Sequence, residues 1–230
     1  MVEVGLSGVG GVAVAPDVGV LMDRVAAATG SADRAVQALL AWKYYAFAIG
    51  EPAMAAWVGH DRVPDLSAAN VVVDCGDGRT SFALVEDRSI GAGRGLRVAL
   101  SPLLDDHLPA VREQFRARVR LGRRAFDALA AAALVSAAAA AAPEGSAFEV
   151  ADRLVTELGS DFASLVEVAE LWGPDGGHRP MVLRSACCLV YRARDGYCST
   201  CNLIDDEQRT AQLAAAGYRW RRRIPVEPLP

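Results

Sequence analysis

Four of the five cysteines of this 230-residue chain lie within one short stretch, CCLVYRARDGYCSTC, which ends at Cys201. Cys187 and Cys188 are adjacent, nine residues follow, and Cys198 and Cys201 then form a C-x-x-C pair. Thiolates are soft ligands that suit zinc and iron–sulfur clusters, and C-x-x-C is a common half of a metal site. The segment therefore predicts a metal centre held by four sulfurs.

Three kinds of chemistry fit such a cluster. A disulfide between Cys198 and Cys201 leaves the vicinal pair unexplained, because adjacent cysteines bond to each other only through a strained ring. A structural zinc site needs four thiolates around one ion, but zinc ribbons use two C-x-x-C-like knuckles and this segment has one. Neighbouring side chains on an extended strand also point to opposite faces. An iron–sulfur cluster is a larger target for the same four thiolates, so the spacing favours it over zinc without excluding zinc.

The other residues of chemical interest predict less. Cys75 follows the apolar run VVVD and is expected to be a structural thiol rather than a fifth ligand. The three histidines, His60, His107 and His178, are expected in surface or capping positions, with His178 preceding the strand that leads to the cysteines. No Ser–His–Asp spacing, P-loop lysine motif or complete nucleotide-binding glycine fingerprint occurs in the sequence. We therefore expect no catalytic residue beyond the metal centre.

Mostly helical elements must position these sulfurs. The sequence predicts helices at 17–30, ended by Gly30, and at 31–50, with Ser31 as N-cap and Gly50 as the stop. Trp42, Tyr44, Tyr45 and Phe47 of the second helix are expected in the core or lining a groove. Two strands are predicted around a turn at 76–78, and a third strand at 95–101.

The second half of the sequence continues this pattern. Two long helices are predicted between 104 and 142, and an amphipathic helix at 148–159. A strand is predicted at 181–193, entering the cysteine segment, and a short helix at 205–217, with Asp205 as N-cap and Gln208 at capping-box spacing. These elements predict an α+β fold, mostly helical with a small antiparallel sheet. We expect a body at 1–178 and a metal-binding segment at 179–230, packed together as one globular unit.

Composition narrows the classes of partner and location. The content of hydrophobic residues is 52%, which indicates a globular fold, and the net charge of −4 gives no general attraction to nucleic acid. The alanine-rich run 125–142 is long enough to span a membrane, but Asp127 lies within it and four arginines precede it, so we expect a packed helix without stable membrane insertion. The first twenty residues lack an early positive charge, which argues against a signal peptide. A cytoplasmic location is therefore expected, where clustered cysteines more often bind metal than form disulfides.

The cysteine segment resembles a known motif. A vicinal pair, about ten residues and a C-x-x-C pair resemble the C-terminal motif of the FhuF-like ferric siderophore reductases. The likeness covers residues 184–201 and includes Arg184 before the pair, Leu189 and Tyr191 after it, and Gly196 in the turn. This chain departs from the family pattern in having nine rather than ten residues between the pairs. Contraction of the turn at 195–196 would absorb the difference.

The resemblance implies a cofactor and an activity. It implies that Cys187, Cys188, Cys198 and Cys201 hold one 2Fe–2S cluster, and the C-x-x-C spacing suggests that Cys198 and Cys201 share an iron. The protein would transfer one electron to a ferric siderophore and release Fe(II), because siderophore oxygens bind Fe³⁺ far more strongly than Fe²⁺. A separate electron donor, a ferredoxin or a flavoprotein, is then expected. The alternatives are a zinc-stabilised binding module and an iron–sulfur redox sensor or electron carrier without a siderophore substrate.

Basic residues flank the cysteines. Arg184, Arg192 and Arg194 lie beside them in sequence, and Arg219 and residues 221–223 add positive charge further on. One interpretation is an ordinary solvated face. The other is a positive rim, formed if the last helix packs on the cysteine loop, that attracts an anionic ferric chelate or an acidic donor.

Overall fold

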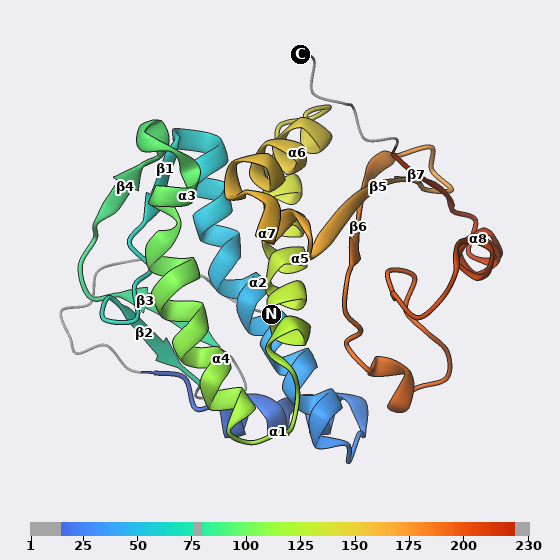
Figure 1. Cartoon of the computed structure of the whole chain (residues 1–230), viewed down its shortest axis with the longest axis horizontal. Helices are drawn as coiled ribbons and strands as arrows, with labels where there is room; N and C mark the ends of the chain where they lie inside the picture. Colours follow the sequence, from blue (N-terminus) through green and yellow to red (C-terminus); the bar gives the residue numbers. More distant parts are fainter. Residues whose placement is uncertain (1–14, 76–79, 224–230) are drawn as a thin grey trace.

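The computed structural model describes residues 15–75 and 80–223. Two expectations fall on residues outside these ranges. They are the turn at 76–78 and the absence of a signal peptide, which concerns mostly residues 1–14. The fold is α+β, as predicted: helices form most of the molecule and three small antiparallel sheets accompany them. Figure 1 shows α2 and α5 side by side at the centre, with the C-terminal segment, coloured orange to red, on one side of the helical body.

The helices and strands of the described residues have the following bounds. The helices are α1 (Val18–Thr29), α2 (Arg34–His60), α3 (Leu96–Ala99), α4 (Leu108–Arg116), α5 (Arg123–Ala141), α6 (Ala147–Leu158), α7 (Ser160–Ala163) and α8 (Asp206–Ala215). The strands are β1 (Arg62–Pro64), β2 (Val71–Asp74), β3 (Ser81–Leu84), β4 (Ser89–Gly91), β5 (Val166–Trp172), β6 (His178–Arg184) and β7 (Arg219–Arg222).

The central helix α2 is longer than the sequence predicted. Its N-cap is Asp33, whose carboxylate accepts hydrogen bonds from the first helical amides, and not Ser31. The stop expected at Gly50 is wrong, because the helix continues to His60. Gly50 serves packing instead: a Cβ placed there would lie 2.5 Å from Leu134 Cδ2. The missing side chain lets α2 and α5 approach closely, which offsets the low helix propensity of glycine.

Other predicted ends and elements are confirmed. Gly30 ends α1 in the left-handed conformation, and Asp205 caps α8 by accepting from the Gln208 amide. The two predicted strands, β2 and β3, pair antiparallel, from Val71 opposite Leu84 to Asp74 opposite Ser81. The strand expected at 95–101 is wrong. That segment contains α3, whose apolar residues at helical spacing, Leu96, Ala99 and Leu100, are buried.

The C-terminal segment forms a unit around a three-stranded sheet of order β6-β5-β7. β5 pairs with β6 from Val166 opposite Arg184 to Trp172 opposite His178, and with β7 along its second half. The boundary expected at residue 178 therefore falls at the start of β6, and β5 belongs with the segment that follows it. A small separate core lies under this sheet, made of Ala169, Met181, Leu183 and Leu213.

Helix α5 is the only one in the described parts of the chain with the length and apolarity of a membrane span. Of its most apolar 18-residue stretch, 61% is buried inside the protein. It packs against α2, α6 and β6, and its alanines allow these close contacts. The prediction of a packed helix is therefore confirmed.

One histidine differs from expectation. His107 is buried, 2% exposed, rather than at the surface. Its Nε2 lies 2.6 Å from the Tyr45 hydroxyl, and the two rings stack. Burial lowers the pKa of His107 to about 4.

Candidate metal centre

The fold brings the four predicted cysteines together. Strand β6 ends at Arg184, and the chain then turns through the vicinal pair into a short 3₁₀ helix at Val190–Arg192. The chain returns to the C-x-x-C pair, which closes a turn in which the Cys201 amide donates to the Cys198 carbonyl at 2.9 Å. The sulfurs therefore come from the two ends of one loop.

The sulfurs contact one another in two pairs. Cys187 Sγ lies 3.5 Å from Cys201 Sγ. The thiols of Cys188 and Cys198 form a second hydrogen-bonded pair. Each pair joins one vicinal cysteine to one cysteine of the C-x-x-C pair, so the structure does not group Cys198 with Cys201 as the spacing suggested. Two sulfurs bound to one tetrahedral metal at about 2.3 Å would lie about 3.8 Å apart, close to the separation observed.

A buried arginine lies against these sulfurs. Arg184 is 6% exposed, and its Nη2 lies 3.0 Å from Cys198 Sγ and 3.7 Å from Cys188 Sγ. Its Nε is buried with no hydrogen-bond partner in the described part of the protein. A buried guanidinium is costly unless negative charge faces it. The position of Arg184 therefore indicates that this sulfur cluster carries negative charge.

Burial and neighbouring groups shift the pKa values of three of the four thiols in different directions. The hydrogen bond from Cys188 lowers the pKa of Cys198, and the charge of Arg184 acts in the same direction. The same hydrogen bond, together with burial, raises the pKa of Cys188. Burial is also the main cause that raises the pKa of Cys201, to about 11. Of these three thiols Cys198 has the lowest pKa, and the thiolate is the form that binds metals.

The backbone after the vicinal pair supports the site. Leu189 has φ of 59°, in the left-handed region that residues other than glycine rarely adopt. This conformation turns its amide toward the site, and the amide donates to Cys187 Sγ at 3.2 Å. Backbone N–H groups directed at sulfur stabilise its negative charge. The strained residue is therefore part of how the loop holds Cys187.

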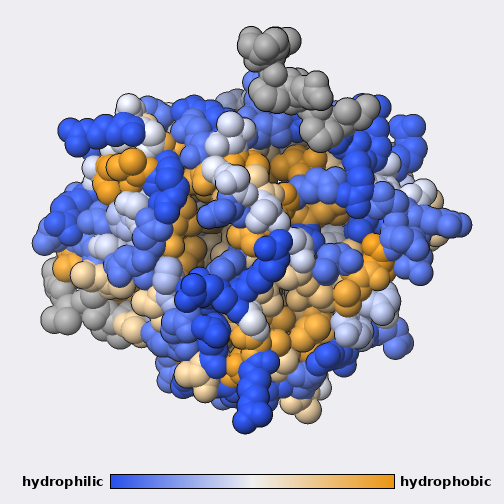
Figure 2. Space-filling model, viewed as in Figure 1, coloured by the Kyte–Doolittle hydropathy of each residue, from blue (hydrophilic) through white to orange (hydrophobic). Residues whose placement is uncertain are grey.

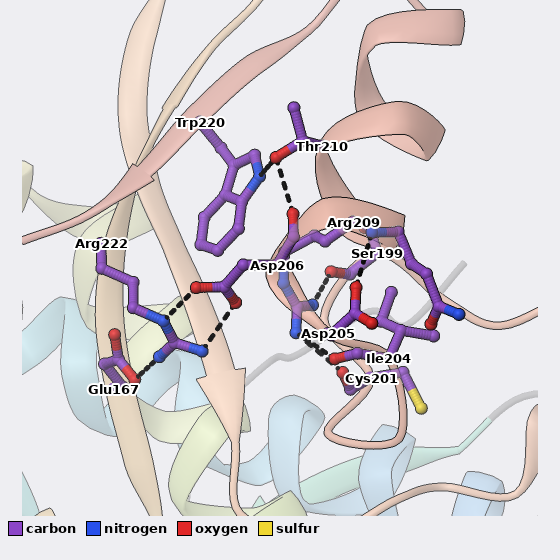
Figure 3. Close-up of polar contacts among 11 residues, drawn as sticks. Glu167, Ser199, Cys201, Ile204, Asp205, Asp206, Arg209, Thr210, Trp220 and Arg222 are labelled. Carbon is purple, nitrogen blue, oxygen red and sulfur yellow. Dashed lines mark hydrogen bonds and ion pairs between the residues drawn. The ribbon is translucent and has the colours of Figure 1, made fainter.

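Helix α8 anchors the C-x-x-C turn through one side chain that the sequence analysis missed. Arg209 is 2% exposed and donates hydrogen bonds to three carbonyls of this turn and of the chain that follows it, those of Ser199, Cys201 and Ile204 (Figure 3). An arginine on the buried side of a helix, four residues before Leu213, was the signal available in the sequence. The last helix therefore packs on the cysteine loop, which was the condition for a positive rim.

The predicted positive rim is only partly present. Arg184 is buried beneath the sulfurs, so it cannot belong to an exposed rim. Arg192 and Arg194 are exposed, but Arg192 pairs with Asp33 at 3.3 Å. Most of the later arginines are neutralised by acids. Arg222 pairs with Glu167 and Asp206 (Figure 3), Arg221 with Glu170, and Arg223 with Asp152.

The structure also shows where Lys43, His178 and Cys75 lie. Lys43, the only lysine of the chain, was not predicted as a site residue. The signal in the sequence was a charged residue within an apolar stretch. Burial is the main cause that lowers the pKa of Lys43, and the charges of Arg184, Cys188 and Cys198 also act on it, so Lys43 lies close to the sulfur cluster. His178 stacks on Trp172 and packs against Phe148, and Cys75 lies just after β2.

In the described residues, no group of three or more His, Cys, Asp or Glu side chains is arranged to hold one metal ion. The sulfur contacts of the site form two pairs, Cys187 with Cys201 and Cys188 with Cys198, and thiolates of this kind suit either zinc or an iron–sulfur cluster. Comparisons with protein-family models, with curated proteins and with solved structures find no match to this chain.

Proposed function

We propose that this protein is a cytoplasmic ferric siderophore reductase whose thiols hold one 2Fe–2S cluster. The observation that carries the proposal is the pairing of the sulfurs of Cys187 with Cys201 and of Cys188 with Cys198, beside a buried arginine. The motif resemblance to the FhuF-like reductases supports the same assignment. A 2Fe–2S cluster, when bound, exchanges single electrons, which matches the one-electron reduction of Fe³⁺ to Fe²⁺.

The residues of the chain have distinct roles in this proposal. The four cysteines bind the cluster, and Arg184 and the Leu189 amide stabilise negative charge on the sulfurs. Cys187 and Cys198 are half-buried, while Cys188 and Cys201 are fully buried. The site is thus shielded from bulk water on one side and close to the surface on the other. A shallow position suits electron exchange with a docked chelate and with a separate donor protein.

The ligand set is tested by anaerobic reconstitution with iron and sulfide. Wild-type protein should take up two irons and two sulfides and show visible charge-transfer absorption. Changing Cys187, Cys188, Cys198 or Cys201 to Ser, one at a time, should abolish or weaken this absorption. Cys75→Ser is the matched control and should retain it. One bound zinc without sulfide would overturn the proposal in favour of a zinc-stabilised binding module.

The activity is tested with the reduced protein under anaerobic conditions. Adding a ferric siderophore should reoxidise the protein, and a ferrous chelator should trap one Fe²⁺ per electron. NAD(P)H alone should not reduce the protein, because a separate donor is required. A reduced protein that stays reduced with every ferric chelate would instead indicate a redox sensor or an electron carrier.

A further inference from the structure

A cavity of about 580 Å³ lies between the helical body and the cysteine loop. Its walls come from α2, from α5, from β5 and β6, and from residues 199–200. Pockets that bind organic ligands are typically about 300 to 1,000 Å³, so this cavity has the size of a binding site. Tyr44, which lines it, is 58% exposed, so the cavity opens to solvent on that side.

The cavity adjoins the proposed metal centre. Ser199 and Thr200, which line it, are the two residues between Cys198 and Cys201. Thr200 Oγ1 lies 3.9 Å from Cys198 Sγ. Arg184 lines the cavity and also contacts two of the sulfurs. A molecule in this cavity is therefore separated from the sulfurs by a single layer of protein.

The chemistry of the lining is apolar with positive charge at one side. Lys43 and Arg184 are its only charged residues, and no acidic side chain is among the described residues that line it. The remaining walls are mostly aliphatic or aromatic, formed by Phe47, Leu129, Ala132, Ala133, Leu171, Pro180, Met181 and Val182. Burial, and then the charge of Arg184, lower the pKa of Lys43, while Cys188 and Cys198 raise it. Because Arg184 also faces the sulfurs, Lys43 provides most of the positive charge that this apolar cavity offers to a ligand, and such a cavity favours an anion with an apolar or aromatic body.

Two other cavities are poorer candidates. The larger of the two, about 830 Å³, lies between α4, α5 and α7, where Figure 2 shows a hollow in the surface. It is lined by Ala130, Ala131 and Leu134, on the face of α5 turned away from the residues that line the first cavity. A third cavity touches Cys201 but measures only about 290 Å³ and is lined mainly by polar residues.

We propose that the cavity between α2, α5 and the C-x-x-C turn binds the aromatic part of an anionic ferric chelate. The inference rests on the proposed reductase function and names the class of chelate. A ferric complex of three catecholates carries three negative charges, whereas a ferric complex of three hydroxamates is neutral. The positive side of the cavity thus selects catecholate or other aryl-oxide chelates over hydroxamates. In the reaction, one electron from an external one-electron donor passes through the protein to Fe³⁺, and the Fe²⁺ formed leaves its oxygen ligands.

Binding is measured with gallium(III), which takes the place of Fe³⁺ but is not reduced under these conditions. The probes are gallium tris(catecholate), an anion, and gallium tris(acetohydroxamate), which is neutral, and calorimetry gives both affinities. We expect wild-type protein to bind the anionic probe at least about tenfold more tightly. Lys43→Met should remove most of this preference and leave binding of the neutral probe unchanged, whereas Lys43→Arg should restore it.

Filling the cavity provides a second and independent variant. Ser136 lines the cavity on α5, and Ser136→Leu should weaken binding of the anionic probe about tenfold or more by occupying its space. Ala140→Leu, at an exposed position one turn further along the same helix, is the matched control and should bind like wild type. Circular dichroism checks that both variants fold.

The possible outcomes separate this inference from the proposed function. If Ser136→Leu and Lys43→Met bind both probes as wild type does, the cavity is not the binding site, even in a protein that reduces ferric chelates. Equal affinity of wild type for the two probes overturns the choice of chelate class. If wild type assembles no iron–sulfur cluster, the reductase function fails, while selective gallium binding would still support an anion site in the cavity.

Discussion

Arg184 should raise the reduction potential of the proposed metal centre, and replacing it by Met tests this. The guanidinium lies 3.0 Å from Cys198 Sγ and 3.7 Å from Cys188 Sγ and is almost fully buried. Methionine keeps much of the length and apolar volume of the side chain but removes its charge and its donors. The reduced centre holds one more negative charge than the oxidised centre, so Arg184 stabilises the reduced state more.

The size of the effect follows from the contacts. A hydrogen bond to a charged group contributes about 1.5 to 3 kcal/mol. Because a one-electron potential changes by 59 mV for each tenfold change, or about 1.4 kcal/mol, losing this energy from the reduced state corresponds to roughly 60 to 130 mV. The upper value is a bound, since part of the energy also stabilises the oxidised state. The expected result is a potential lower by several tens of millivolts in Arg184→Met.

The assay is an anaerobic redox titration of the reconstituted protein, followed by visible absorption. Arg184→Lys keeps a positive charge and should show a smaller decrease than Arg184→Met. Arg194→Met removes an exposed arginine from the same loop and should leave the potential unchanged, because water screens exposed charges. A potential in Arg184→Met equal to that of wild type, with iron and sulfide content preserved, would refute the assignment of Arg184 as the charge partner of the sulfurs.

Three further predictions concern the helical core and the anchoring of the C-x-x-C turn. His107 is held neutral by burial with a pKa of about 4 against an ordinary 6.5, so the unfolded state binds its proton first as pH falls. The contribution of neutral His107 to the free energy of unfolding is complete above pH 6.5, and about 3 kcal/mol of it should be lost between pH 6.5 and 4. Denaturant titrations of wild type and His107→Gln should therefore diverge over this range. Parallel curves would contradict the assignment. Gly50→Ala should lower the free energy of unfolding by about 1 kcal/mol or more through its clash with Leu134, whereas Gly59→Ala, with open space around its Cβ, should raise it; equal shifts would remove the packing argument. Arg209→Met should reduce metal retention at fixed chelator concentration because three carbonyls of and after the C-x-x-C turn lose their donor, and unchanged retention would count against that anchoring role.

The sequence was most informative where local rules decide the structure. The helix end at Gly30 and the cap at Asp205 depend on a few neighbouring residues, and both are confirmed. The end expected at Gly50 failed because glycine there serves a contact with α5, more than eighty residues away in sequence. Propensity cannot distinguish a glycine that ends a helix from one that permits close packing.

The candidate site shows the same division. The four cysteines could be grouped by sequence because they lie close together along the chain, but their pairing depends on how the loop turns at Leu189. Arg184 was noticed as a neighbour of the cysteines, yet its burial follows from the position of β6 within the sheet. Lys43 and Arg209 reach the site from separate helices, so no short motif could include them.

The small size of the second core has a consequence for turnover in the cell. Among the described residues, the separate core of the three-stranded sheet and α8 has four buried apolar residues, whereas the main core of the protein is extensive. A unit with so little buried surface opens locally at low free energy unless a bound metal holds it closed. Protein without metal should therefore be cut by proteases within residues 185–205 while its helical body stays intact. If the protein binds the proposed cluster, a cell could remove the form without metal by this route and keep the form that holds it.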